Sequence, residues 1–150
     1  IVFLSDVTPN RAEWKPYIGL ADASGRAAQL FGYHRDRNLA GNPLRLDGKS
    51  YEKGLALHSR SVLVYRLPGK FRHFRAIAGI DDSVGGRGHV RLEIYGDKEK
   101  LLERIITAKD APFPLDVDIT GVVRLKILVD YGDELDIGDH LDLCNARITK

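Results

Sequence analysis

The chain has 150 residues, with 23 basic and 21 acidic side chains and a net charge of +2. That length suits one domain with its own core, and the near balance of charge argues against a nucleic-acid or membrane-surface partner, which normally shows a basic excess. No apolar run approaches the roughly 18 residues of a membrane-spanning helix, and a lone cysteine, Cys144, excludes an intrachain disulfide. We therefore expect a single domain over residues 1–150, excised from a larger multidomain protein.

The dominant pattern is an alternation of apolar and polar residues, which is typical of strands with one face on a core and one face in water. In chain order, strands are expected at residues 2–7, 44–46, 54–58, 62–67, 71–80, 90–95, 101–107, 115–119, 123–129 and 141–148. A short helical turn is expected near residues 24–31, and the apolar N-terminal segment is expected to pair with the last strand. Eight to ten mostly antiparallel strands of this kind predict an all-β fold, a β-sandwich or jelly roll.

Familiar catalytic spacings are missing from the sequence. There is no Gly-x-Ser-x-Gly elbow, no His-Glu-x-x-His or Cys-x-x-Cys pair and no phosphate-binding loop. Asp81 and Asp82 are adjacent carboxylates, but successive residues on a strand point to opposite faces. We expect at least one of them to cap a turn or support the following glycine-rich loop.

Two further polar segments have more than one interpretation. His58 ends an apolar run, so a structural histidine with one satisfied ring nitrogen is favoured over a ligand contact. Residues 131–140 hold four carboxylates and two glycines. Such a loop is usually just solvated, yet it offers the oxygen ligands that Ca²⁺ prefers, without matching the twelve-residue EF-hand pattern.

Five stretches then occur in order along the chain: LDGKSYEKGLALHS at 46–59, VYRL at 64–67, FRAIAGIDD at 74–82, GHVRLEIYGD at 88–97 and GDHLDLCNARI at 138–148. Together they resemble the NPCBM family of carbohydrate-binding modules over about residues 44–150. One departure is Leu143, which stands where the family usually has a tryptophan. If that position belongs to the core, leucine is tolerable; if it is a sugar platform, the ligand is lost or changed.

The resemblance implies a galactose-binding-like jelly roll that is not itself an enzyme. It is expected outside the cell, in the periplasm or at the cell surface, appended to a glycoside hydrolase or another protein. Its partners would be glycans, a galactoside or a related sugar, and other domains of the parent protein, with no nucleic acid and no membrane insertion. The expected ligand-binding residues on the loop rim are His58, Asp81, Asp82, Arg87, Tyr131, Asp139 and His140.

The resemblance also implies a structural Ca²⁺, for which Asp139 and Asp142 are the candidate ligands. Two other functions stay open. One is a structural or protein-interaction module without sugar binding, because a fold does not fix a function. The other is a glycoside hydrolase, which would need two carboxylates roughly 5 to 10 Å apart across a cleft.

Overall fold

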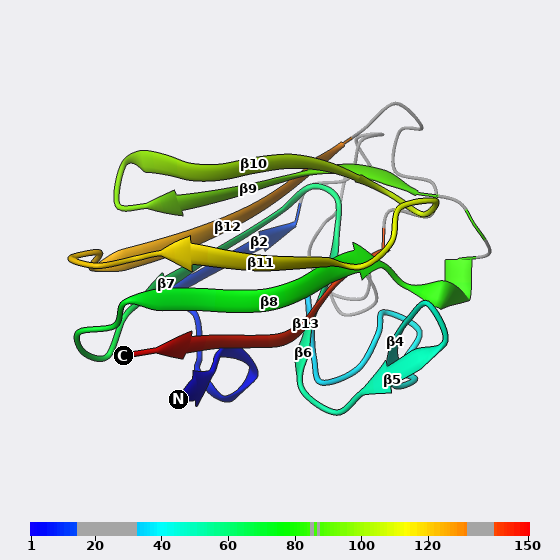
Figure 1. Ribbon diagram of the computed structural model, residues 1–150, viewed down its shortest axis with the longest axis horizontal. Helices are drawn as coiled ribbons and strands as arrows, with labels where there is room; N and C mark the ends of the chain where they lie inside the picture. Colours follow the sequence, from blue (N-terminus) through cyan, green and yellow to red (C-terminus); the bar gives the residue numbers. More distant parts are fainter. Residues whose placement is uncertain (15–32, 85, 87, 132–139) are drawn as a thin grey trace.

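The computed structural model describes residues 1–14, 33–84, 86, 88–131 and 140–150. Its two antiparallel sheets face each other as a sandwich, which confirms the all-β prediction (Figure 1). The helical turn expected near residues 24–31 lies outside the described residues. Within the described ranges, no helix has the length and apolar character needed to cross a membrane.

From β6 to β13 the strands alternate between the two sheets, except that β9 and β10 are neighbours in the same sheet. The first sheet has the order β11 (Phe113–Asp118), β8 (His73–Ile80), β13 (His140–Thr149), β6 (Gly54–His58) and β3 (His34–Arg35), and β1 (Val2–Phe3) also pairs with β13. The second sheet has the order β10 (Glu99–Thr107), β9 (His89–Gly96), β12 (Arg124–Tyr131), β7 (Ser61–Arg66) and β2 (Arg11–Trp14). A separate hairpin joins β4 (Leu44–Leu46) to β5 (Lys49–Tyr51), and two 3-10 turns, η1 (Leu4–Asp6) and η2 (Asp82–Val84), complete the described elements.

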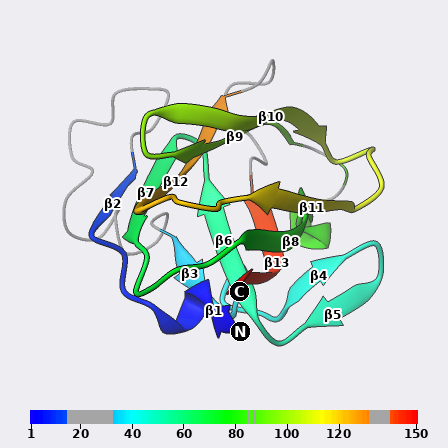
Figure 2. The ribbon, with the colours of Figure 1, turned by 60° about the vertical axis from the view of Figure 1, so that its left-hand side comes forward.

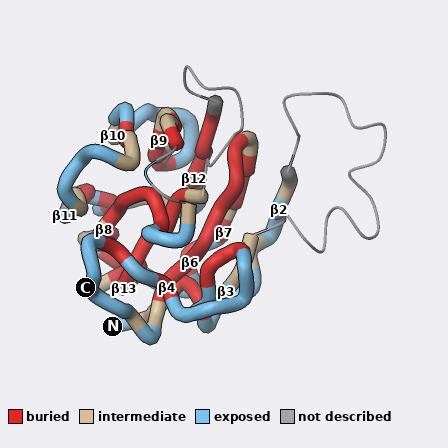
Figure 3. Tube along the Cα trace, turned by 90° about the vertical axis from the view of Figure 1, so that its right-hand side faces the viewer, coloured by how far each residue is buried: buried red, intermediate tan, exposed pale blue. Residues whose placement is uncertain are grey.

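The main core lies between the two sheets, because every second side chain of the central strands is apolar and points inward. Tyr65 on β7 and Phe74 on β8 are its largest fully buried side chains. Burial runs along β6, β7, β8 and β13, whereas the edge strand β10 is largely exposed (Figure 3). The edge position explains the difference, since β10 pairs with β9 alone.

A β-bulge in β13 keeps its apolar side chains on the core side. The register against β8 shifts between Cys144 and Arg147, where β13 has one extra residue. Asn145 adopts a φ of 54° there, a left-handed conformation in which asparagine is enriched. The shift brings Ala146 and Ile148 into the core, where an unbroken alternation would have placed Asn145 and Arg147.

The β4–β5 hairpin packs on the outer face of the first sheet, beside β13 and β6 (Figure 2). A second, smaller core holds it there: Leu39, Leu44, Leu46, Ala56 and Cys144. Gly54 makes this close packing feasible. Its φ is +155°, and a Cβ atom on it would lie 2.7 Å from the Leu143 carbonyl oxygen and 2.7 Å from Leu44 Cδ1.

The structure corrects the predicted strands at a few points. The strand expected at 2–7 ends at Phe3, because residues Leu4–Asp6 form η1. The strands β2, β3 and β5 were not predicted, since two to four residues are too few to show a period. The expected pairing of the N-terminal segment is confirmed, with Val2 opposite Ile148, and the two termini lie side by side (Figure 1).

Candidate functional site

The predicted rim residues converge on one end of the sandwich. His58 ends β6 and lies opposite His140, which begins β13. Asp81 follows β8 at the same end, and its backbone N–H donates to the His140 carbonyl oxygen at 2.9 Å. In the second sheet, Tyr131 ends β12 at this same end of the sandwich (Figure 1). The topology therefore gathers loops that are far apart in sequence, as the loop-rim prediction requires.

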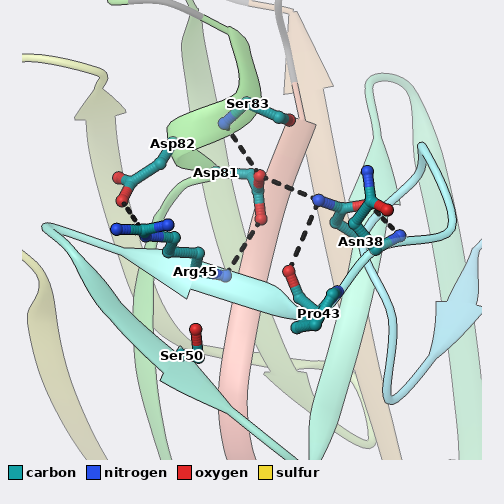
Figure 4. A pocket seen from close by; sticks show the side chains of 8 residues that line it. Asn38, Pro43, Arg45, Ser50, Asp81, Asp82 and Ser83 are labelled. Carbon is teal, nitrogen blue, oxygen red and sulfur yellow. Dashed lines mark hydrogen bonds and ion pairs between the residues drawn. The ribbon is translucent and has the colours of Figure 1, made fainter.

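A hollow of about 490 Å³ opens at this end, between the β4–β5 hairpin and η2. We call it the hairpin hollow. Seven of its eight lining residues have polar side chains: Asn38, Asn42, Pro43, Arg45, Ser50, Asp81, Asp82 and Ser83 (Figure 4). No aromatic ring belongs to this set. Its volume lies within the usual range of small-ligand sites, about 300 to 1,000 Å³.

Asp81 is the hub of the hollow and is only 2% exposed. Its carboxylate accepts hydrogen bonds from Asn38 Nδ2 at 3.1 Å, the Ser83 backbone N–H at 3.0 Å and the Arg45 backbone N–H at 3.2 Å (Figure 4). Burial by itself would raise the pKa of Asp81, but Asp142 and the Ser83 and Arg45 donors together lower it. The ionised carboxylate thus ties three segments of chain together.

Asn38 fixes the loop in front of β4. Its side-chain oxygen accepts from the backbone N–H groups of Ala40 at 3.0 Å and Asn42 at 2.9 Å. Its amide nitrogen donates to the Pro43 carbonyl oxygen at 3.5 Å as well as to Asp81. Because Asn38 is 2% exposed, water cannot solvate its side-chain amide, and these hydrogen bonds satisfy the amide instead. Its role is to shape the hollow.

Asp82 holds the turn of the hairpin and stays at the surface. Its carboxylate accepts from the backbone N–H groups of Asp47 at 2.9 Å and Gly48 at 2.8 Å. Arg45 Nε lies 3.5 Å from the same carboxylate, and the Arg45 side chain is 58% exposed. Both adjacent aspartates therefore cap turns, as expected, and Arg45 presents its guanidinium at the rim.

Behind the hollow, Asp142 is fully buried. The Asp81 carboxylate and the Arg45 backbone N–H are close enough to shift its pKa, although neither of its carboxyl oxygens meets hydrogen-bond geometry with a described residue. Burial raises the pKa of Asp142 to about 10, and the neighbouring Asp81 carboxylate adds to the rise. Asp142 is consequently a neutral acid at pH 7, while Asp81 carries the charge.

The two histidines lie close together and are largely buried. Their ring centroids are 5.4 Å apart at an interplanar angle of 62°. His58 Nδ1 lies 2.6 Å from the Ser59 carbonyl oxygen, and His58 is 6% exposed. One ring nitrogen therefore has a partner, as the structural interpretation of His58 expects, and a ligand contact at His58 stays a prediction. Burial and the nearby His58 lower the pKa of His140, which favours its neutral form.

The predicted binding residues thus differ in how far they reach the surface. Asp82 lies on the rim of the hairpin hollow; Asp81 lines it but is fully engaged, and His58 and His140 lie behind it. Arg87 and Asp139 lie outside the described residues, and the side chain of Tyr131 is not described either. Contact with a ligand stays a prediction for all seven.

The described residues do not complete a calcium site. Ca²⁺ takes six to eight oxygen ligands, and the described ranges hold no group of three or more metal-ligating side chains. Asp142 is enclosed and Asp139 is outside the described part. Calcium binding at Asp139 and Asp142 therefore stays a prediction.

Of the eight lining residues, only Asp81 and Asp82 were predicted, and five of the six others lie in one segment: Asn38, Asn42, Pro43, Arg45 and Ser50. They belong to a segment that was interpreted as a loop around one short strand. The Asp47-Gly48 turn between two three-residue strands was the available signal for a hairpin there. Leu143, by contrast, is fully buried between the sheets, so in this chain it is a core residue.

The chain is similar to known carbohydrate-binding modules in both sequence and structure. The sequence model of the NPCBM/NEW2 domain matches residues 4–149. The solved structure of CBM51 from Clostridium perfringens GH95, in complex with methyl-galactose, has a TM-score of 0.81 at 26% identity and covers 99% of this chain and 99% of that chain. CBM51-2 of C. perfringens ZmpB, solved with GlcNAc and together with INT domains, has a TM-score of 0.80 at 27% identity, over 97% of this chain and 30% of that one.

A Renibacterium salmoninarum protein, named as an endo-alpha-N-acetylgalactosaminidase, is 36% identical over 61 residues. Those residues are 41% of this chain and 4% of that protein, so the matched part is a small fraction of the relative's length.

Proposed function

We propose that this chain, which belongs to the NPCBM/NEW2 domain family and is a non-catalytic carbohydrate-binding module, holds a terminal galactoside or a related sugar at the hairpin hollow. The observation that carries the proposal is the combination of family membership with a polar hollow at the loop end of the sandwich. The likeness to a module solved with methyl-galactose, which covers nearly all of both chains, supports galactose as the first sugar to test.

The chemistry of the rim suits vicinal sugar hydroxyls. Asp82 offers carboxylate acceptors and Arg45 offers guanidinium donors, and the two groups are neighbours at 3.5 Å. Asn42 and Ser50 add exposed amide and hydroxyl groups to the same lining. Hydrogen bonds to charged groups are stronger than those between neutral groups, so we expect Arg45 and Asp82 to dominate the contact.

The frame beneath these groups is already ordered. Asp81 and Asn38 hold the backbone of the lining in place before any ligand arrives, which reduces the entropy lost on binding. The lining carries no aromatic platform, however. We therefore expect dissociation constants between millimolar and micromolar, which corresponds to about 4 to 8 kcal/mol.

Isothermal titration calorimetry with galactose, N-acetylgalactosamine, GlcNAc and glucose tests the proposal. Replacing Arg45 by alanine removes a charged hydrogen bond, worth about 1.5 to 3 kcal/mol, so Arg45→Ala should bind roughly 10 to 100 times more weakly. The matched control is Arg11→Ala on β2, whose side chain is also 58% exposed. Equal binding by both variants would reject the hairpin hollow, and no binding of any sugar by the wild type would reject sugar recognition.

We propose in addition that the module acts outside the cell or at its surface, tethering an enzyme domain of its parent protein to glycans. Support comes from the neighbouring structures, where the similar domain is one part of a longer chain. The test is retention of the parent protein on galactose-coated beads. A parent protein that carries Arg45→Ala should elute early, and retention unchanged by this substitution would contradict the tethering role.

A further inference from the structure

A second hollow lies at the other end of the sandwich, away from the hairpin hollow. Its volume is about 560 Å³, and it opens between the β7–β8 connection, the β11–β12 connection and the last residue of the described chain, Lys150. We call it the basic cleft. The eight-residue strand β8 separates the two hollows, a length of about 25 Å. A single sugar ring is therefore too small to occupy the hairpin hollow and the basic cleft at the same time.

The walls of the basic cleft are positively charged. Arg66, Lys70, Arg72 and Lys150 all line it, and all four side chains are exposed. None of them forms an ion pair with a carboxylate of the described residues, and no Asp or Glu side chain belongs to the described lining. With a net charge of only +2 for the whole chain, four cations around one cleft are a marked local excess that favours an anionic ligand.

The nearest carboxylates already have backbone partners. Asp97 accepts from the backbone N–H groups of Val123 at 3.3 Å and Arg124 at 3.0 Å. Asp118 accepts from the backbone N–H and the hydroxyl of Thr120, at 2.9 and 2.7 Å. Both aspartates serve the turns behind the cleft. Arg72 still attracts the Asp118 carboxylate electrostatically. Because none of the four cations is held in an ion pair with a carboxylate of the described residues, they can also attract an incoming anion.

The floor of the cleft is apolar. Phe71 and Leu67 are only 7% and 8% exposed, and Val122 is half-buried beside them. Lys150 Nζ lies 6.0 Å from the centroid of the Phe71 ring. An apolar floor beneath a ring of cations suits a ligand that has a hydrocarbon face and one or two negative charges.

The backbone around the cleft has no strand edge to offer. The Leu67 N–H donates to the Val123 carbonyl oxygen at 2.8 Å, and the Ile119 N–H donates to the Arg72 carbonyl oxygen at 2.9 Å. The Arg72 N–H in turn donates to Thr149 at 2.8 Å. These three N–H groups already have partners, which disfavours the addition of a peptide as a further strand here. Recognition must come from the side chains, which favours a compact ligand over an extended acidic peptide.

We propose that the basic cleft is a second binding site and that it takes an acidic saccharide, a sugar ring that bears a carboxylate or a sulfate. The C–H face of the ring packs on Phe71 and Val122, and the anionic group lies among Arg66, Arg72 and Lys150. A cleft of this volume accommodates one or two rings. The basic cleft shares no lining residue with the hairpin hollow. Experiments can therefore reject acidic-saccharide binding at the cleft and neutral-sugar binding at the hairpin hollow independently of each other.

The test is titration of the protein, followed by backbone amide NMR shifts, with methyl glucuronide, galactose 6-sulfate, sialyllactose and neutral lactose. We expect at least one acidic saccharide to shift amides of residues 67–72 and 119–124. Its affinity should fall at least tenfold between 20 and 500 mM NaCl, because an exposed charge pair is screened by salt. Galactose binding at the hairpin hollow should not change with salt.

Arg72→Gln combined with Lys150→Gln should weaken acidic-saccharide binding at least tenfold and leave the melting temperature and neutral-sugar binding unchanged. Lys109→Gln, an exposed lysine at the opposite end, is the matched control and should have no effect. The proposal is overturned if no acidic saccharide shifts these amides at 10 mM. It is also overturned if Lys109→Gln causes an equal loss, or if an acidic hexapeptide binds more tightly than every saccharide.

Discussion

Replacing Gly54 by alanine should destabilise the module more than the same change at Gly41, Gly48, Gly86 or Gly121, which also have a positive φ. A Cβ at this position would lie 2.7 Å from the Leu143 carbonyl oxygen, 2.7 Å from Leu44 Cδ1 and 3.0 Å from Cys144 Cα. Two of these three atoms belong to the backbone of β13 and cannot rotate away. The strand β13 and the hairpin would therefore have to move apart.

The expected magnitude has two parts. A non-glycine residue at a φ of +155° costs about 1 to 3 kcal/mol in backbone strain, and inserting a methyl group into a packed core costs about 1 to 3 kcal/mol more. Gly41→Ala is the matched control: its φ is +85°, but no atom lies within 4 Å of its added Cβ. That variant should lose only the strain, so the two should differ by about 1 to 3 kcal/mol.

Urea unfolding at 25 °C, followed by circular dichroism, measures both free energies of unfolding. For a chain of this size, a loss of 4 kcal/mol corresponds to a fall of roughly 8 to 16 °C in melting temperature. If Gly54→Ala and Gly41→Ala agree within about 0.5 kcal/mol, steric contact with β13 is not what requires glycine at position 54.

Three further predictions concern the buried residues around the site. In the folded protein Asp142 has a pKa of about 10, whereas in the unfolded chain its pKa is near 3.8. The free energy of unfolding should therefore fall as the pH rises from 5 to 8, by about 1.4 kcal/mol per pH unit from this group. Asp142→Asn, measured in buffer with EDTA, should remove this pH dependence of stability, and an unchanged pH dependence would refute a neutral Asp142. A rise in melting temperature on adding Ca²⁺ to the wild type, but not to Asp142→Asn, would support the calcium prediction. Asn38→Ala should lower the free energy of unfolding by about 2 to 4 kcal/mol, because Asp81 and two backbone N–H groups lose their hydrogen bonds to Asn38. A loss of less than about 1 kcal/mol in chemical denaturation would show that Asn38 does not hold this loop. Leu143→Ala should cost about 2 to 5 kcal/mol in the same assay yet leave sugar affinity of the folded protein unchanged, so a selective loss of sugar binding would show that position 143 contacts the ligand.

The sheets were predictable because the apolar alternation is long in the strands that form them. In β11 the sequence pattern and the observed burial agree almost residue for residue. In β9 and β12 the alternating apolar residues are buried as expected, but the polar Glu93 and Asp130 are buried as well. The pattern failed where an element is short, as in β3 and β5. It also could not reveal the bulge at Asn145, since the switch of faces there depends on pairing with β8 and not on local composition.

The candidate site was predictable only in part. The adjacent Asp81 and Asp82 marked the right end of the sandwich, and their turn-capping role followed from strand geometry. Asn38 and Arg45 were not found, because they reach Asp81 across 43 and 36 residues of sequence. Such contacts depend on how the hairpin packs on the sheet, so they cannot be predicted from neighbouring residues in the sequence.

The burial of Cys144 has a practical consequence for studying ligand entry. Burial raises the pKa of its thiol, and the thiolate is the form that reacts with alkylating reagents. A cysteine placed on the rim, as in Ser83→Cys, would then be the single accessible thiol of the folded chain. A fluorophore coupled there in one step would report sugar arrival by its change in emission, with no need to remove the native sulfur first.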